Sequence, residues 1–141
     1  MGIFLDTGFY IGLIDPTDDH YNRSLEILSE LQTGKFGQIF TSSFVMAESA
    51  TLVASRTKKN PQAIREIKNF FSGNEQIAII LRANEEIESD SWEIFQKLNM
   101  RIKVKVVSYI DCTNISFCKK YLLDNILSFD PHYDGWLTRI F

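Results

Sequence analysis

Short apolar runs alternate along the chain with longer amphipathic segments, which is the pattern of strands and helices that follow one another. The four runs are too short for helices and read as strands. They lie at residues 2–5, 38–41, 76–81 and 125–128. The longer segments read as helices, most clearly where Leu25, Leu28 and Leu31 recur at helical spacing. The helices are expected at residues 8–14, 18–31, 44–59, 61–72, 84–98 and 108–122.

Two further segments complete the pattern. Residues 101–106 alternate apolar and charged side chains, which fits an edge strand or an ordered loop equally well, and residues 137–141 read as a last edge strand. Strands that alternate with helices favour an α/β/α sandwich with a mostly parallel central sheet. We expect residues 1–141 to form a single domain of this class, with its functional crevice beyond the carboxyl ends of the strands.

Composition narrows the classes of function. The 141 residues are 45% hydrophobic, as in ordinary globular proteins. No apolar run is long enough to cross a membrane, and the first residues lack the features of a secretion signal, so we expect a cytoplasmic protein without a membrane partner. Two cysteines at a spacing unlike that of ligand or redox pairs, and two histidines, are too few for a zinc site of nitrogen and sulfur ligands. Any metal is therefore expected to be magnesium or manganese.

Four carboxylates stand at the edges of apolar segments: Asp6, Glu48, Asp111 and Asp130. Asp6 and Asp130 directly follow predicted strands, which places both at the carboxyl edge of the sheet. A buried carboxylate must be paired or must bind a metal, so four that converge imply a hard divalent cation with oxygen ligands. This is the central hypothesis from the sequence.

Each acid also has a structural explanation. Asp6 fits the N-cap of the following helix, Asp111 fits a capping box with Ser108, and Asp130 fits a turn. Glu48 is harder to explain in this way, because it shares a helix face with the apolar Val45 and Leu52. Asp111 likewise projects with a stripe of apolar residues. That stripe consists of Ile115, Cys118 and Leu122.

The net charge of −3 argues against a uniformly basic surface that coats nucleic acid, but positive charges are concentrated locally. Such clusters are candidate phosphate contacts. The candidates for RNA contacts are Arg56, Lys58, Lys59, Arg65, Lys119 and Lys120. A second basic stretch contains Lys97, Arg101, Lys103 and Lys105.

Taken in order, these segments resemble the PIN domain family of metal-dependent ribonucleases, and within it the VapC-type toxins of toxin–antitoxin pairs. The resemblance covers nearly the whole chain and rests on the order and spacing of several short segments. They are Phe4-Leu5-Asp6-Thr7, Leu13-Ile14-Asp15-Pro16 with His20, Thr41-Ser42-Ser43 before Glu48, Ser108-Tyr109-Ile110-Asp111, and Leu127-Ser128-Phe129-Asp130-Pro131-His132-Tyr133.

The resemblance implies a function and roles for single residues. Asp6, Glu48 and Asp111 would be the core Mg²⁺ (or Mn²⁺) ligands, and Asp130 the fourth, more variable acid; Thr7 and Ser43 would orient the carboxylates or the attacking water. The reaction would be hydrolysis of RNA phosphodiester bonds by an activated water molecule. Proteins of this kind usually form homodimers and are silenced by a small antitoxin protein whose tail covers the acidic site.

Two other functions remain open at this point. The chain could be a non-catalytic RNA-binding or protein-interaction module with a degenerate PIN fold, in which the acids serve only as caps and ion-pair partners. A phosphohydrolase acting on small phosphoesters is less favoured, because the sequence has neither a D-x-D motif after its first strand nor a glycine-rich phosphate loop.

Overall fold

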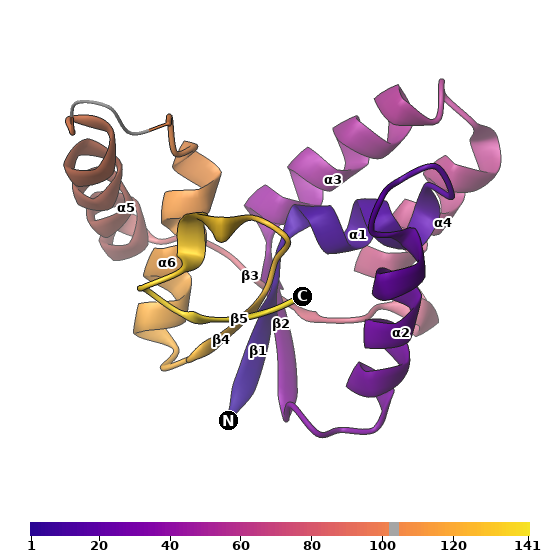
Figure 1. Ribbon diagram of the computed structural model, residues 1–141, viewed down its shortest axis with the longest axis horizontal. Helices are drawn as coiled ribbons and strands as arrows, with labels where there is room; N and C mark the ends of the chain where they lie inside the picture. Colours follow the sequence, from indigo (N-terminus) through magenta and orange to yellow (C-terminus); the bar gives the residue numbers. More distant parts are fainter. Residues whose placement is uncertain (102–104) are drawn as a thin grey trace.

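The computed structural model describes residues 1–101 and 105–141, and at its centre is one sheet of parallel strands (Figure 1). The order across the sheet is β3-β2-β1-β4-β5, and every neighbouring pair is parallel. The strands are β1 (Gly2–Leu5), β2 (Gln38–Ser42), β3 (Ile79–Leu81), β4 (Asn125–Leu127) and β5 (Thr138–Ile140). The predicted parallel sheet is confirmed, and β5 is the expected last edge strand.

Helices cover both faces of the sheet, which confirms the predicted α/β/α sandwich. In Figure 1, α5 and α6 lie together on one side, and α1 to α4 lie on the other. The helices are α1 (Thr7–Ile14), α2 (Tyr21–Gln32), α3 (Ser43–Arg56), α4 (Pro61–Phe71), α5 (Glu85–Asn99) and α6 (Tyr109–Lys120), with short 3₁₀ turns η1 (Gly73–Glu75) and η2 (Pro131–Tyr133). None of the helices in the described ranges combines the length and the apolar character that a membrane crossing needs.

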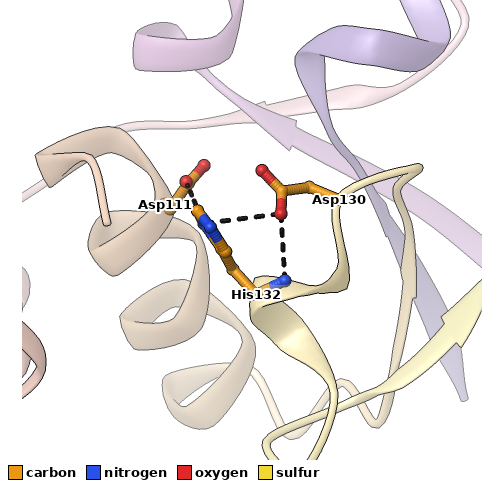
Figure 2. A group of neighbouring side chains, drawn as sticks. All are labelled: Asp111, Asp130 and His132. Carbon is orange, nitrogen blue, oxygen red and sulfur yellow. Dashed lines mark hydrogen bonds and ion pairs between the residues drawn. The ribbon is translucent and has the colours of Figure 1, made fainter. Parts of the chain in front are cut away.

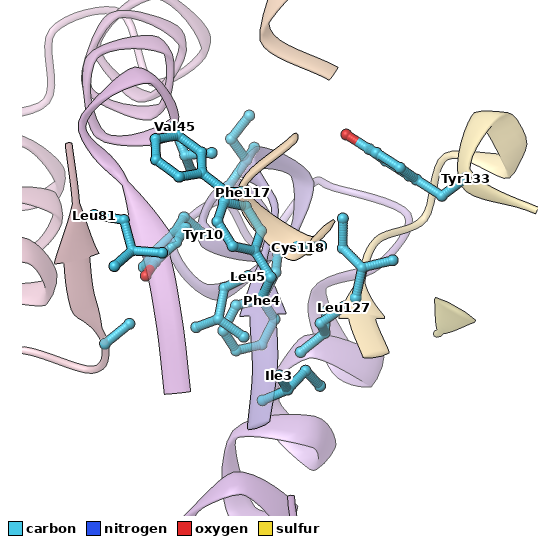
Figure 3. Packing of buried hydrophobic residues seen from close by; sticks show 14 of the residues in the cluster. Ile3, Phe4, Leu5, Tyr10, Val45, Leu81, Phe117, Cys118, Leu127 and Tyr133 are labelled. Atoms are coloured by element: carbon cyan, nitrogen blue, oxygen red, sulfur yellow. The ribbon is translucent and has the colours of Figure 1, made fainter. Parts of the chain in front are cut away.

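The core is built around β1, the middle strand. Ile3, Phe4 and Leu5 are all completely buried, as expected for a parallel strand with helices on both faces. Phe4 stacks on Phe117 of α6, with ring centroids 6.2 Å apart, and Figure 3 shows the two rings side by side. This contact fixes α6 against the strand that precedes Asp6.

The strand order places a crevice at one defined edge of the sheet. From β1 the chain moves outward through β2 to β3, and it later returns to the other side of β1 as β4. Ligands of open α/β sheets bind at such a reversal, outside the carboxyl ends of the strands. Asp6 continues the pairing there, because its backbone N–H donates to the Leu127 carbonyl at 3.1 Å.

Two predicted helices end earlier than the sequence suggested. After Arg56, Lys58 and Lys59 adopt positive φ angles of 53° and 60°, which stop α3 before residue 59. After Lys120, Leu122 has a φ of 54° and an exposed fraction of 84%, so its place on the inner stripe with Asp111 was wrong. Positive φ at such residues is set by the tertiary path of the chain, not by apolar spacing.

The segment that the sequence left open lies between α5 and α6. Residues 102–104 are outside the described part of the chain, so the choice between strand and loop for 101–106 stays undecided there. The two ends of the segment are held together by the side chain of Asn99. Its amide nitrogen donates to the Val107 carbonyl, and its oxygen accepts from the Val107 N–H, both at 2.9 Å.

Candidate metal centre

The four predicted acids line one pocket of about 460 Å³ at the carboxyl edge of the sheet. Asp6 follows β1, Glu48 lies in the middle of α3, Asp111 is in the first turn of α6, and Asp130 follows β4. The fold therefore brings together acids that are far apart in the sequence. Other described residues that line the pocket are Thr7, Gly8, Ile11, Leu52, Arg56, Lys105, Ser108, Ser128, Phe129 and Pro131.

Asp6 is the most buried of the four acids, with 6% of its surface exposed. Its Oδ1 accepts from the Thr7 N–H at 2.8 Å, which is the N-cap contact that the sequence suggested, and from the Asn114 amide at 3.1 Å. Its Oδ2 accepts from the Ser128 hydroxyl at 2.7 Å. Both oxygens are thus fixed in position, and the helix cap accounts for only one of the three contacts.

The environment of Asp6 opposes its negative charge. Burial, followed by the charge of Asp111, raises the pKa of Asp6 from 3.8 to about 7, with a smaller contribution from Glu48. Hydrogen bonds from Ser128 and Thr7 lower the pKa but do not offset this rise. A divalent cation in the pocket would reverse the balance, because it would favour the ionised form of every nearby carboxylate.

Asp111 connects the pocket to the end of the chain. The Ser108 hydroxyl accepts from the Asp111 N–H at 3.0 Å, as in the predicted helix cap. The Asp111 carboxylate turns instead to Tyr133, whose hydroxyl donates to Oδ1 at 2.9 Å. The Asn114 amide donates to the same hydroxyl at 2.9 Å as well as to Asp6, so Asn114 and Tyr133 bridge the two acids.

Asp130 and Asp111 face each other across His132 (Figure 2). The backbone N–H of His132 donates to Asp130 Oδ1 at 2.9 Å, which confirms the turn that the sequence suggested for Asp130. One ligand atom from each of these three residues lies within 4.8 Å of the other two. Among the described residues, this is the one group of three such side chains whose ligand atoms lie this close together.

Glu48 contributes charge to the pocket from the other side. It is half-buried, and Leu52 and Arg56 follow it at intervals of four residues, so all three face the pocket from α3. This agrees with the expectation that Glu48 points where apolar side chains point. Arg56 at the far end of the row pairs with Asp18, with an N–O distance of 2.9 Å.

The two residues expected to orient the acids have different positions. Thr7 lines the pocket next to Asp6, and its buried Oγ1 has no hydrogen-bond partner among the described residues. Ser43 begins α3 but does not line the pocket, and the capping hydroxyl of that helix belongs to Ser42, which accepts from the Val45 N–H at 3.2 Å. The structure thus brings Thr7, but not Ser43, into contact with the pocket.

The basic residues that were predicted to contact RNA also lie in different places. Arg56 lines the pocket, and Lys58 joins Arg56 in an adjoining cavity of about 550 Å³ between α1 and α4. Lys59 and Arg65 are exposed and line neither cavity, whereas Lys119 and Lys120 pair with Asp90 and Glu86 of α5. From the second basic stretch, Lys105 lines the pocket, while Lys103 is outside the described residues.

Four residues with contacts to the acids were not selected from the sequence as site residues: Asn114, Ser128, His132 and Tyr133. Only Ser128 left a signal, as a polar residue between Leu127 and Phe129, and that signal did not indicate which acid it contacts. Tyr133 left none, because a buried tyrosine in a turn reads as core.

The donor set suits a divalent cation. The pocket itself offers carboxylate oxygens and the Thr7 side chain, and the imidazole of His132 lies beside Asp111 and Asp130; neither Cys112 nor Cys118 lines the pocket. Oxygen-rich sets of this kind bind magnesium or manganese. The observation that favours a positive charge here is the convergence of four carboxylates on one pocket, where Asp111 and Glu48 add to the effect of burial in raising the pKa of Asp6.

Comparison with known proteins gives consistent results. The PIN domain family matches residues 3–135. A VapC ribonuclease of Archaeoglobus fulgidus is 26% identical over 133 residues, which is 94% of this chain and 80% of that protein.

Solved structures share the fold at lower sequence identity. The sarcin-ricin loop cleaving toxin VapC20 of Mycobacterium tuberculosis superposes with a TM-score of 0.74 at 21% identity, over 95% of this chain and 94% of that one. VapBC2 of Rickettsia felis, bound to a DNA fragment from its promoter, has a TM-score of 0.68 at 19% identity, over 99% and 98% of the two chains. FitAcB of Neisseria gonorrhoeae has a TM-score of 0.68 at 16% identity, over 99% and 96%.

Proposed function

Because this chain belongs to the PIN domain family, we propose that it is an endoribonuclease that hydrolyses RNA with a divalent cation bound by Asp6, Glu48, Asp111 and Asp130. The observation that carries the proposal is the convergence of these four acids on one pocket, from four separate elements. Acids placed together at this cost in charge repulsion need a cation, and a polyanionic substrate can approach them only through it.

Magnesium or manganese is the proposed ion, because the donors are mainly carboxylate oxygens. When bound, such an ion activates water and neutralises charge on the phosphate. The residues of the chain then have positioning roles. Ser128, Asn114 and the Thr7 N–H hold both oxygens of Asp6, and Tyr133 holds Asp111.

Two further groups complete the proposed reaction. Thr7 next to Asp6 would help to orient the acid or the attacking water, and Arg56 and Lys105 at the pocket wall would hold the phosphates that flank the cleaved bond. No side chain of the pocket is needed as a covalent nucleophile.

The proposed biological role is that of the toxin in a toxin–antitoxin pair. The relative in Archaeoglobus fulgidus is a VapC ribonuclease, and the Rickettsia felis structure is a VapBC complex. An antitoxin that silences this chain would have to cover the acidic pocket, for which a basic side chain is the complementary group. We propose a cytoplasmic location, where cellular RNA would be available as substrate, and the expected homodimer stays a prediction.

The test is RNA cleavage by the purified protein. A panel of structured and single-stranded RNAs is incubated with Mg²⁺, Mn²⁺ or EDTA, using the wild type, Asp6→Asn and Asp111→Asn. Asp19→Asn is the matched control, because Asp19 is exposed and does not line the pocket. We expect cleavage that needs metal, is lost in both pocket variants and is retained in the control.

Two results would contradict the proposal. Full activity of Asp6→Asn would show that the acids are not the reactive centre. Absence of cleavage, together with no rise of the melting temperature on adding metal, would favour the non-catalytic module instead.

A further inference from the structure

His132 occupies an unusual position between two of the acids. Its Nδ1 lies 3.4 Å from Asp111 Oδ2 and 3.4 Å from Asp130 Oδ1 (Figure 2). All three side chains are half-buried, and Asp111 and Asp130 line the pocket while His132 lies beside them. The sequence offered no reason to select this histidine, because the expected ligands were all carboxylates.

An ordinary hydrogen bond does not account for this geometry. N–H···O bonds have heavy-atom distances of about 2.7–3.2 Å, so both 3.4 Å contacts are long, and one Nδ1 proton serves only one acceptor well. Nor is the imidazole needed to hold the acids. The Tyr133 hydroxyl already binds Asp111, and the His132 backbone N–H already binds Asp130, each at 2.9 Å.

The two 3.4 Å distances are compatible with ligands of a common ion, and the ligand atoms of all three residues lie within 4.8 Å of one another. Two atoms that are each bound at about 2.1 Å to one cation, at an angle between octahedral and tetrahedral, lie roughly 3.0–3.4 Å apart. The contacts of Nδ1 with the two carboxylates are at the upper end of this range. Thr7, whose buried hydroxyl has no hydrogen-bond partner among the described residues, lines the same pocket.

We propose that His132 is a direct nitrogen ligand of the metal, together with Asp111 and Asp130, and that it gives the site a preference for Mn²⁺ over Mg²⁺. This inference rests on the proposed function, because it concerns the ion of the same site. Magnesium takes oxygen ligands almost exclusively, whereas manganese accepts an imidazole among carboxylates. The nitrogen therefore adds affinity for Mn²⁺ and little for Mg²⁺.

The experiment measures binding of each metal to the metal-free, full-length protein without any RNA. Mn²⁺ and Mg²⁺ are titrated into the wild type and His132→Ala, with His20→Ala as the matched control, because His20 is the other of the two histidines. We expect His132→Ala to weaken Mn²⁺ binding about tenfold or more and Mg²⁺ binding less than about threefold. His20→Ala should leave the ratio of the two affinities unchanged.

A spectroscopic measurement on the wild type makes the test independent of any variant. Pulsed electron paramagnetic resonance of bound Mn²⁺ detects hyperfine coupling to a nitrogen that is directly bound. We expect this coupling in the wild type and in His20→Ala, and its loss in His132→Ala. His132→Gln, which keeps a polar side chain of similar length and the backbone contact to Asp130, repeats the comparison if the alanine variant does not fold.

The outcomes separate this inference from the proposed function. Mn²⁺ binding that depends on Asp6 and Asp111 but shows no nitrogen coupling would overturn the role of His132 and leave the nuclease proposal intact. If His132→Ala weakened the binding of Mn²⁺ and of Mg²⁺ equally, the proposed preference for Mn²⁺ would also be overturned. If the wild type bound neither metal, the inference and the metal site of the proposed function would fall together.

Discussion

A closed ring of side-chain and backbone contacts connects three of the four acids. It leads from Asp6 to Asp111 on one side and from Asp6 to Asp130 on the other, and His132 joins the two ends. The connecting residues are Asn114, Tyr133, His132 and Ser128. Because the ring consists of groups of the protein itself, the acids keep their positions without an ion, which lowers the entropic cost of binding one.

The raised pKa of Asp6 predicts how stability depends on pH. Between 3.8, the ordinary value, and about 7, the folded value, the folded protein binds the proton more tightly than the unfolded chain does. The metal-free protein should therefore lose stability as the pH rises through this range, by up to about 4 kcal/mol. The melting temperature should fall from pH 5 to pH 8 without metal.

Two controls distinguish Asp6 from the other titrating groups. Asp6→Asn should flatten this pH dependence, because the amide has no proton to lose. Adding Mn²⁺ should raise the melting temperature more at pH 8 than at pH 5, since the ion binds the ionised carboxylates. An unchanged pH dependence in Asp6→Asn would show that Asp6 is not the responsible group.

Tyr133→Phe removes one hydroxyl from the ring and keeps the buried aromatic ring. Asp111 loses the donor to its Oδ1, so we expect the cleavage rate at saturating metal to fall about tenfold to a hundredfold. The stability cost should be about 1–2 kcal/mol, because Asn114 also loses an acceptor. Tyr121→Phe, at a half-exposed tyrosine away from the pocket, is the control, and equal rates for both variants would contradict the role of Tyr133.

The acids could be selected from the sequence because they depart from local patterns, either after an apolar strand or on an apolar helix face. Their partners could not. Asn114 lies 108 residues from Asp6, and nothing near either residue indicates that they meet. His132 was discounted because two histidines cannot form a zinc site, although one histidine among carboxylates is a different kind of site.

At the scale of elements, α1 and α2 approach closely at a glycine. A Cβ added to Gly12 would overlap the Ser24 hydroxyl oxygen and lie 3.1 Å from Ser24 Cβ. This contact fixes the orientation of α1 relative to α2. It thereby also fixes the path of the connecting residues, which include Asp15 and His20. His20 in turn stacks on Phe129, with ring centroids 3.9 Å apart, next to Asp130.

Gly12→Ala should destabilise the protein by about 1–3 kcal/mol, because the added methyl group has no room in this contact. Urea unfolding followed by circular dichroism measures the effect. Ser24→Ala should cost little by itself, since the Ser24 hydroxyl has no partner among the described residues. In the double variant it should recover part of the loss, and strictly additive effects would contradict the proposed overlap.

The order and type of the elements could be predicted because strands and helices differ in length and apolar spacing. Their ends were less predictable. The third strand was predicted at residues 76–81, but β3 comprises only Ile79–Leu81, which pair with β2. A strand ends where its neighbour in the sheet stops pairing with it. The sequence of one segment does not reveal where that happens.

At the scale of the whole molecule, the net charge is −3, yet basic side chains are concentrated in a few places, including the acidic pocket. Arg56 and Lys105 lie at the wall of the acidic pocket, whereas Lys119 and Lys120 do not line it and pair with acids of α5; Arg56 also pairs, with Asp18. Their place at the pocket makes Arg56 and Lys105 the better candidates for RNA contacts, and the sequence could not separate them from the others because the pocket forms only in the folded chain.

Arg56→Gln should weaken RNA binding and reduce the dependence of the logarithm of the affinity on the logarithm of salt concentration by about 0.7 for one lost phosphate contact. Lys119→Gln is the matched control and should leave the slope unchanged. Fluorescence anisotropy of labelled RNA, measured at several salt concentrations in the Asp6→Asn background to prevent cleavage, gives both slopes. Equal slopes for the two variants would exclude Arg56 as a contact.

The position of β1 in the middle of the sheet also has a consequence for biosynthesis. A ribosome makes Asp6 at a point 122 residues before Ser128, whose hydroxyl holds the Asp6 Oδ2. A growing chain therefore carries one acid of the pocket without the groups that orient it, and β1 lacks the neighbour on that side. If the four acids act together as proposed, the nuclease site is therefore incomplete until β4 and Ser128 have been synthesised.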